Sequence, residues 1–251
     1  MQPTPFYLDW TFWAAALSLV AILLSQLPPL HLLLRPKRLE VEVHSRIQLT
    51  HMVGNPNASV VLSIRNTGGR ALRVKSMSMN VSRDGHTPIS LPGQGYFETP
   101  SSQSSVLFVP FTLKPGETWA HSVTFLNTFE RQVEKLFREK LSTLDGDIRR
   151  KLRDRPEGSR EAVVAEPENV KPFSELFHRI FIWYPGEYIA QLNVSAEPGS
   201  ASFVKRYRFT LFESDTEDLR AYLDDYKFGA GLTYKVDHHA GVNIPLVEHD
   251  A

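Results

Sequence analysis

The sequence contains no cysteine, and this absence removes three kinds of site. It excludes a disulfide framework, a thiolate metal site and a cysteine nucleophile. The familiar catalytic signatures are missing as well, since there is no Gly-x-Ser-x-Gly elbow, no Walker loop, no dinucleotide glycine fingerprint and no His-Glu-x-x-His pair. We therefore expect a protein that is not an enzyme and that carries no cofactor.

An excess of charge of either sign is also lacking, because 28 acidic side chains balance 28 basic ones among 251 residues. A chain without net charge has no overall attraction for nucleic acid or anionic lipid, so any such attraction must come from a local patch. The 42% of hydrophobic residues provide enough apolar material for one large core or two small ones.

Formal charge is absent from the whole of residues 10–34. Residues 10–27 alone would form a helix of about 27 Å, close to the roughly 30 Å hydrocarbon core of a bilayer. A cleaved signal peptide is disfavoured because residues 1–9 contain no Lys or Arg. After a short N-terminal segment over 1–9, we predict a transmembrane helix over 10–34 that kinks near Pro28 and Pro29, with Trp10 and Trp13 at one membrane boundary.

Three cations, Arg35, Lys37 and Arg38, follow the end of this apolar segment. The positive-inside bias places them, and the chain that follows, in the cytoplasm, with the N-terminus outside. The sequence thus predicts a single-pass protein of the inner, cytoplasmic membrane. The alternative orientation, with the domain on the outer side of that membrane, stays open.

Period-two alternation of apolar and polar residues follows the apolar segment. Leu39, Val41 and Val43 form one such series. Further series run through residues 60–64 and 77–81, separated by Gly and Asn turn signals. We therefore expect short antiparallel strands.

A tight Pro-Gly turn leads into an alternating strand in the segment "IFIWYPGEYIAQLNV". This segment resembles the immunoglobulin-like strand that begins with a tyrosine corner, with Tyr188 in the corner position and Ala190, Leu192 and Val194 facing inward. Over residues 39–129 and 181–212 the pattern resembles the Ig-like domains common in prokaryotic envelope proteins. The resemblance implies a mainly β protein with an antiparallel β-sandwich over 39–212.

An insertion interrupts the predicted sandwich at residues 130–172. Apolar residues recur every three or four positions over 130–155, which is typical of an amphipathic helix. A polar, proline-bounded segment over 156–172 indicates a mobile loop. We expect a short C-terminal helix over 213–228, opened by a capping box of Ser214 and Glu217, and then a loosely ordered tail over 229–251.

The run "RRKLRDR" at the end of the insertion helix is a candidate patch for lipid or for a partner protein. Its cations are Arg149, Arg150, Lys151, Arg153 and Arg155. The plainer interpretation is a solvated helix end, since cations there are stabilised by the helix dipole. Nucleic acid is disfavoured because no aromatic side chains lie among the charges.

Two further groups of residues are candidate sites. Phe177, Phe181, Trp183 and Tyr184 belong to the densest aromatic stretch and form a candidate interface, although half-buried strands more often place such residues in the core. His238, His239 and His249 are weak candidates for metal ligands. A solvated tail is the favoured interpretation there, because a tail provides no surrounding groups to orient the imidazoles.

These observations lead to one hypothesis and two alternatives. The leading hypothesis is a membrane-anchored binding or scaffolding module, without catalytic activity, whose partners are the bilayer and a protein or a second copy of the chain. The first alternative is an adhesion or assembly module facing the cell envelope. The second is a metal-dependent enzyme or metal sensor that uses the C-terminal histidines.

Overall fold

The computed structural model describes residues 10–26, 35–99, 102, 104–233 and 241–249. Within them the chain is mainly β. The strands are β1 (Leu39–Met52), β2 (Asn55–Asn66), β3 (Leu72–Arg83), β4 (Ile89–Phe97), β5 (Val106–Leu107), β6 (Phe111–Leu113), β7 (Thr118–Leu126), β8 (Gly186–Glu197), β9 (Phe203–Leu211), β10 (Val242–Pro245) and β11 (Val247–Glu248). The α-helices are α1 (Trp10–Gln26), α3 (Arg131–Arg153), α4 (Pro167–Ile180) and α5 (Glu213–Arg220), and the 3₁₀ helices are η2 (Gly199–Ala201) and η3 (Ala221–Phe228).

The described strands form one continuous antiparallel sheet in the order β10-β1-β2-β7-β4-β3-β8-β9-β11, with β5 and β6 added beside β4 and β3. Strand β4 joins the two halves of the sheet. Its first half pairs with β3 at Ile89–Pro92, and its second half pairs with β7 from Gly93 to Phe97, with a register shift between Gly93 and Gly95. The two sheets expected of a sandwich are therefore connected through β4 and are not separate.

Side chains that alternate along the strands fill the core between the halves of the sheet. In β2, Val60, Leu62 and Ile64 are buried, whereas Val61 on the opposite face is half exposed. Strand β8 follows the same rule, and its Ala190, Leu192 and Val194 are buried as expected. Burial on one face only is what fixes the register of such strands, because a one-residue slip would expose every core side chain.

Tyr188 begins this inward series of β8. Its hydroxyl oxygen lies 2.7 Å from the carbonyl oxygen of Ile182 and 2.8 Å from that of Tyr184, and its ring stacks on Phe209. A tyrosine corner makes this kind of hydrogen bond back to the upstream backbone. The expected corner geometry is therefore present at Tyr188, while the wider resemblance to Ig-like domains stays a prediction.

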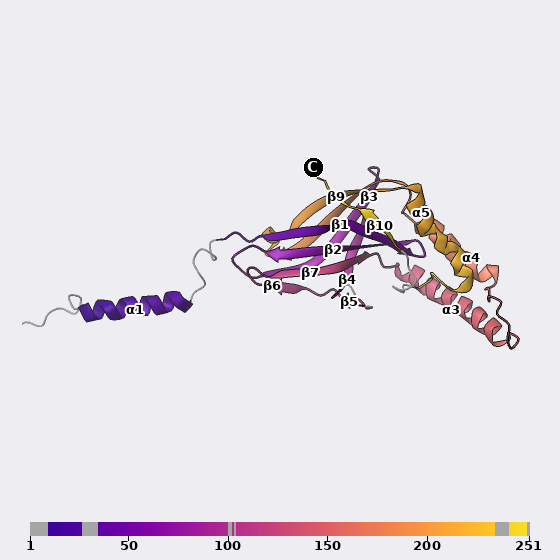
Figure 1. Cartoon of the computed structure of the whole chain (residues 1–251), viewed down its shortest axis with the longest axis horizontal. Helices are drawn as coiled ribbons and strands as arrows, with labels where there is room; N and C mark the ends of the chain where they lie inside the picture. Colours follow the sequence, from indigo (N-terminus) through magenta and orange to yellow (C-terminus); the bar gives the residue numbers. More distant parts are fainter. Residues whose placement is uncertain (1–9, 27–34, 100–101, 103, 234–240, 250–251) are drawn as a thin grey trace, which may run out of the picture.

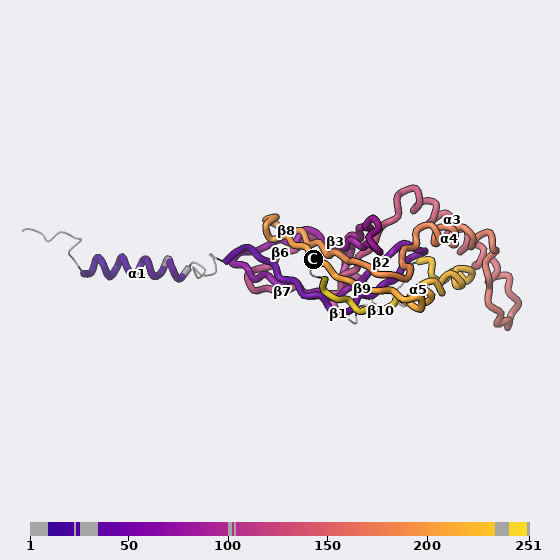
Figure 2. The backbone as a smooth tube through the Cα atoms, turned by 90° about the horizontal axis from the view of Figure 1, so that it is seen from above, coloured from indigo at the N-terminus to yellow at the C-terminus, as the bar shows by residue number. Residues whose placement is uncertain are grey.

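Helices α3 and α4 lie between β7 and β8 in the sequence and pack together at one end of the sheet, where α5 also lies (Figure 1). A view turned by 90° places the same three helices at that end (Figure 2). The insertion therefore forms a helical cap on one end of the β-structure.

The predicted transmembrane helix over 10–34 is wrong. The helix observed there, α1, has 17 residues, or about 25 Å, against a hydrocarbon core of about 30 Å. Among the helices of the described residues, none combines the length and the apolar character that crossing a membrane requires. The single-pass inner-membrane localisation, in either orientation, depended on that helix and is corrected with it. Residues 1–9 and 27–34, with the expected kink at Pro28 and Pro29, lie outside the described residues.

The end of the expected loop, the capping of the C-terminal helix and the type of its second half also differ from expectation. The predicted loop over 156–172 gives way to α4 at Pro167, and α4 continues to Ile180. The C-terminal helical segment spans 213–228 as expected, as α5 followed by η3. Its first turn, however, is closed by Asp215, whose carboxylate accepts a hydrogen bond from the Phe212 amide, and not by the expected pair of Ser214 and Glu217. The helix changes to the 3₁₀ form at Ala221.

Residues 242–248 of the expected loose tail form two short strands, β10 and β11. Strand β10 pairs with β1, and β11 pairs with β9. Ile244 in β10 and Leu246, which lies between β10 and β11, are buried. Because β1 and β9 lie near opposite ends of the strand order, the tail bridges the two halves of the sheet.

Candidate binding groove

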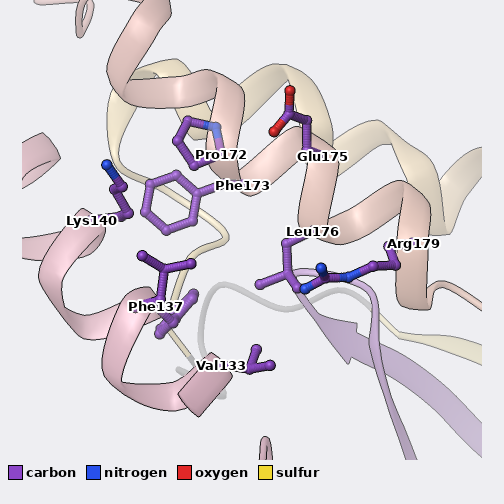
Figure 3. A pocket seen from close by; sticks show the side chains of 9 residues that line it. Val133, Phe137, Lys140, Pro172, Phe173, Glu175, Leu176 and Arg179 are labelled. Atoms are coloured by element: carbon purple, nitrogen blue, oxygen red, sulfur yellow. The ribbon is translucent and has the colours of Figure 1, made fainter.

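An apolar groove of about 260 Å³ lies between α3 and α4 (Figure 3). Its lining residues are Val133, Leu136, Phe137 and Lys140 from α3, and Pro172, Phe173, Glu175, Leu176 and Arg179 from α4. Leu136 is 53% exposed, although its neighbours Phe137 and Phe173 are buried. The groove thus presents an accessible leucine on a floor of packed aromatic rings.

On each of the two helices, apolar side chains three or four residues apart lie on one face, and these two faces pack together beneath the groove. Val133 and Phe137 stand four residues apart on α3, and Phe173, Leu176 and Phe177 stand at positions i, i+3 and i+4 on α4. Across the helix pair, the rings of Phe137 and Phe173 meet edge to face at 5.6 Å between centroids. Such an aromatic contact holds the floor in place, so the groove is preformed.

A charged clasp joins the end of α3 to the start of α4. The buried carboxylate of Asp147 accepts a hydrogen bond of 2.8 Å from the Glu166 amide and pairs with Arg150 at 2.7 Å. Lys151 lies 3.5 Å from Asp147 and 2.6 Å from the Glu166 carboxylate. The clasp therefore sets where α4 starts relative to α3.

The ionisation of the clasp follows from these contacts. The pKa of Asp147 is lowered, chiefly because the Glu166 amide donates a hydrogen bond to its carboxylate. The pKa of Lys151 is raised, chiefly through its hydrogen bond with the Glu166 side chain. Both groups are therefore held in their charged forms at neutral pH.

His51 ties the other side of α4 to the sheet and to α5. Its Nδ1 accepts a hydrogen bond from the Gly54 amide at 3.1 Å, and its Nε2 lies 2.6 Å from the Leu219 carbonyl oxygen. Because Nδ1 is an acceptor, the proton resides on Nε2, which donates to that carbonyl. The ring also contacts Phe177 and Phe181 edge to face. His51 is thus a structural residue beneath the groove.

Three charged side chains stand at the rim of the groove. Glu175 on α4 pairs with Lys171 at 3.7 Å. Lys140 and Arg179 are exposed and, within the described part of the chain, have no carboxylate within ion-pair distance. Figure 3 shows these two cations at opposite sides of the apolar floor. The groove therefore combines an apolar floor with two cations that lack an ion-pair partner and one carboxylate, Glu175, that is already paired with Lys171.

The aromatic stretch proposed as an interface lies mostly in the core. Phe177, Phe181 and Trp183 are buried, and Tyr184 is half-buried. The Trp183 indole donates a hydrogen bond of 2.8 Å to the Thr50 carbonyl oxygen. Buried side chains of this kind fasten α4 and the start of β8 to β1, so they support the groove and do not form its surface.

The basic run at the end of α3 divides into two parts. Arg150 and Lys151 pair with Asp147, and of the two only Lys151 is half-buried, since Arg150 stays exposed. Arg149 and Arg153 are exposed as well, and Arg155 is half-buried. Arg149, Arg150 and Arg153 therefore remain exposed, and of these Arg150 is already paired with a carboxylate.

The remaining candidates are scattered. Trp10 and Trp13 are exposed on α1. Arg35, Lys37 and Arg38 precede β1, and the Arg38 carbonyl accepts a hydrogen bond from the Thr67 amide.

The proposed metal ligands are not brought together. His238 and His239 lie outside the described residues, and the His249 amide donates a hydrogen bond to the Arg206 carbonyl beside β11. No group of three or more potential metal-binding side chains gathers within the described residues.

Sequence reasoning missed the α4 half of the groove. The signal was present, because Phe173, Leu176, Phe177 and Ile180 stand at i, i+3, i+4 and i+7. Pro172 and the dense aromatic composition obscured it, since both are more typical of loops and strands than of a helix interior.

Comparison with known proteins finds no matching family model, no matching curated protein and no matching solved structure. The functional argument therefore stands on the geometry of the groove.

Proposed function

We propose that this chain is a binding or scaffolding module, without catalytic activity of its own, that captures a partner protein in the groove between α3 and α4. The observation that carries the proposal is the exposed Leu136 on a preformed apolar floor. Apolar grooves between helices recur as recognition sites for segments of other proteins.

The sheet and the clasp give this surface a rigid support. Residues that bind a partner gain affinity when their own conformation costs little to order. The edge-to-face contact of Phe137 with Phe173 and the clasp at Asp147 restrict the two helices before any partner arrives, and the ring contact of His51 with Phe177 restricts α4 from the side of the sheet. This arrangement suits a scaffold that presents one face of a helix pair.

A pair of matched variants tests the proposal. Leu136→Glu places a charge in the groove, whereas Leu152→Glu places the same charge on the same helix, at a leucine that is 49% exposed and does not line the groove. Immobilised full-length chain is used to capture proteins from a lysate of the native host, and the bound proteins are compared by mass spectrometry.

We expect one or more proteins that bind the wild type and Leu152→Glu but are lost with Leu136→Glu. Circular dichroism confirms that all three chains are folded. The proposal is wrong if the wild type captures nothing beyond the resin background, or if all three chains capture the same proteins.

A further inference from the structure

We propose that the partner segment is an amphipathic helix that carries acidic side chains at both ends of a short apolar stripe. This inference rests on the proposed function and names the chemistry of the partner for the same groove.

The size of the groove favours side-chain anchors over a small molecule. Pockets that enclose drug-sized ligands measure about 300–1,000 Å³, and this groove, at about 260 Å³, is smaller and open between two helices. A helix that lies in a groove inserts only a few apolar side chains from adjacent turns. The space beside Leu136 and Phe173 fits that mode.

The spacing of the lining residues sets the length of the contact. On α3 the lining runs from Val133 to Lys140, which is about 10 Å or two helical turns. If i is the first residue of the partner helix that reaches the groove, its apolar residues at about i+3 and i+4 therefore contact the floor. Its charged residues at about i and i+7 reach the two sides of the groove.

Charge complementarity determines the sign of those flanking residues. Lys140 and Arg179 stand at opposite sides of the floor, without ion-pair partners in the described residues. Glu175, the third charged residue of the rim, pairs with Lys171 at 3.7 Å, so the rim carries one more cation than carboxylate. Helix α3 itself carries eight basic and four acidic side chains. Partner carboxylates at both ends of the stripe would pair with these cations, whereas lysines there would be repelled.

A second copy of this chain is a poorer occupant. The most exposed apolar helix that a second copy offers is α1, and its sequence contains no charged residue. It would cover the floor but leave Lys140 and Arg179 without carboxylates. The groove is therefore better matched to an acidic segment of another protein.

The test uses two synthetic helical peptides of identical length with the same apolar stripe. The acidic peptide carries Glu at the two flanking positions, and the basic peptide carries Lys there. Fluorescence anisotropy measures the binding of each peptide to the full-length chain. We expect the acidic peptide to bind about tenfold more tightly than the basic one at low salt, and the ratio to shrink as salt screens the rim charges.

Two double variants give the control. Lys140→Glu with Arg179→Glu reverses the charge at the groove and should reverse the preference between the peptides. Arg149→Glu with Arg153→Glu makes the same change in net charge on exposed α3 residues outside the groove, and it should leave the preference in favour of the acidic peptide. Circular dichroism checks that both variants are folded.

Several outcomes overturn the inference. Equal binding of the two peptides contradicts the inference that the groove selects acidic residues. So does an equal change in peptide preference in the two double variants. A second copy is the occupant if the peptides do not bind and the chain instead forms dimers, as measured by light scattering. In that case Leu136→Glu should abolish the dimers. In each case proteins captured in a Leu136-dependent manner still support the proposed function, whereas their absence removes the function as well.

Discussion

Truncating one buried and one exposed side chain separates the core beneath the groove from its surface. Phe177 is 1% exposed, its ring stacks on Phe181 at 4.6 Å, and it meets His51 at 5.1 Å. A buried Phe→Ala substitution costs about 3–5 kcal/mol of unfolding free energy, because burial is lost and a cavity remains. We therefore expect Phe177→Ala to destabilise the full-length chain by this amount.

Leu136 provides the contrast, because it is already 53% exposed. Full burial of a leucine is worth about 1.5–3 kcal/mol, and roughly half of that is available to lose here. Alanine is also a better helix former than leucine, which offsets part of the loss. We expect Leu136→Ala to cost about 1 kcal/mol or less while it weakens partner capture.

Urea unfolding followed by circular dichroism measures both changes, and the slope of each transition checks that the unfolded states are comparable. The difference between the two variants should be at least about 2 kcal/mol. A cost below about 1 kcal/mol for Phe177→Ala would refute the reasoning, because it would mean that the aromatic stretch lies on the surface as an interface and not in the core.

Three further changes test other parts of the structure by thermal or urea unfolding of the full-length chain. Tyr188→Phe should cost about 1 kcal/mol at neutral pH through the lost hydroxyl hydrogen bond. Burial raises the pKa of Tyr188 to about 12, so its stabilising contribution is complete below about pH 10 and is lost as the pH rises toward 12; the variant should lose less stability over that interval, and an unchanged alkaline profile contradicts this. The lowered pKa of Asp147 stabilises the fold above the ordinary carboxyl pKa of about 4, and this contribution is lost as the pH falls through the folded value; Asp147→Asn should therefore flatten the acid limb of the stability profile, and an acid limb as steep as that of the wild type argues against the clasp. Gly54→Ala should destabilise more than Gly116→Ala, because both glycines have positive φ but only at Gly54 would a Cβ meet backbone, 2.8 Å from the Phe177 carbonyl oxygen; equal costs would show that the close approach is not real.

Half of the candidate site could be predicted from the sequence. The stripe of α3 was evident, because a helix whose apolar residues recur every three or four positions must bury that face against something. Its partner was not evident, because Pro172 lies inside α4 and suggested a loop. The aromatic residues near α4 drew attention as a surface although they are core, since composition does not tell which side of an element is covered.

Local periodicity determined much of the β-structure by itself. The alternation in β2 and β8, the turn before β8 and the inward series that begins at Tyr188 were legible without the fold, because the period of two along a strand and the preference of Pro-Gly for turns are properties of short segments. The apolar character of residues 10–26 was equally legible, but an apolar run does not state how many residues will be helical, and the described helix is too short to cross a membrane.

Only the tertiary structure decided which distant segments meet. The pairing of β10 with β1 and of β11 with β9, the clasp between Asp147 and Glu166, and the isolation of Lys140 and Arg179 at the groove all join or separate residues far apart in the chain. No local pattern encodes these relations, because each depends on the free energy of packing the whole chain at once. The groove exists because two helices, each amphipathic by its own sequence, were brought together at an angle that leaves part of their apolar faces uncovered.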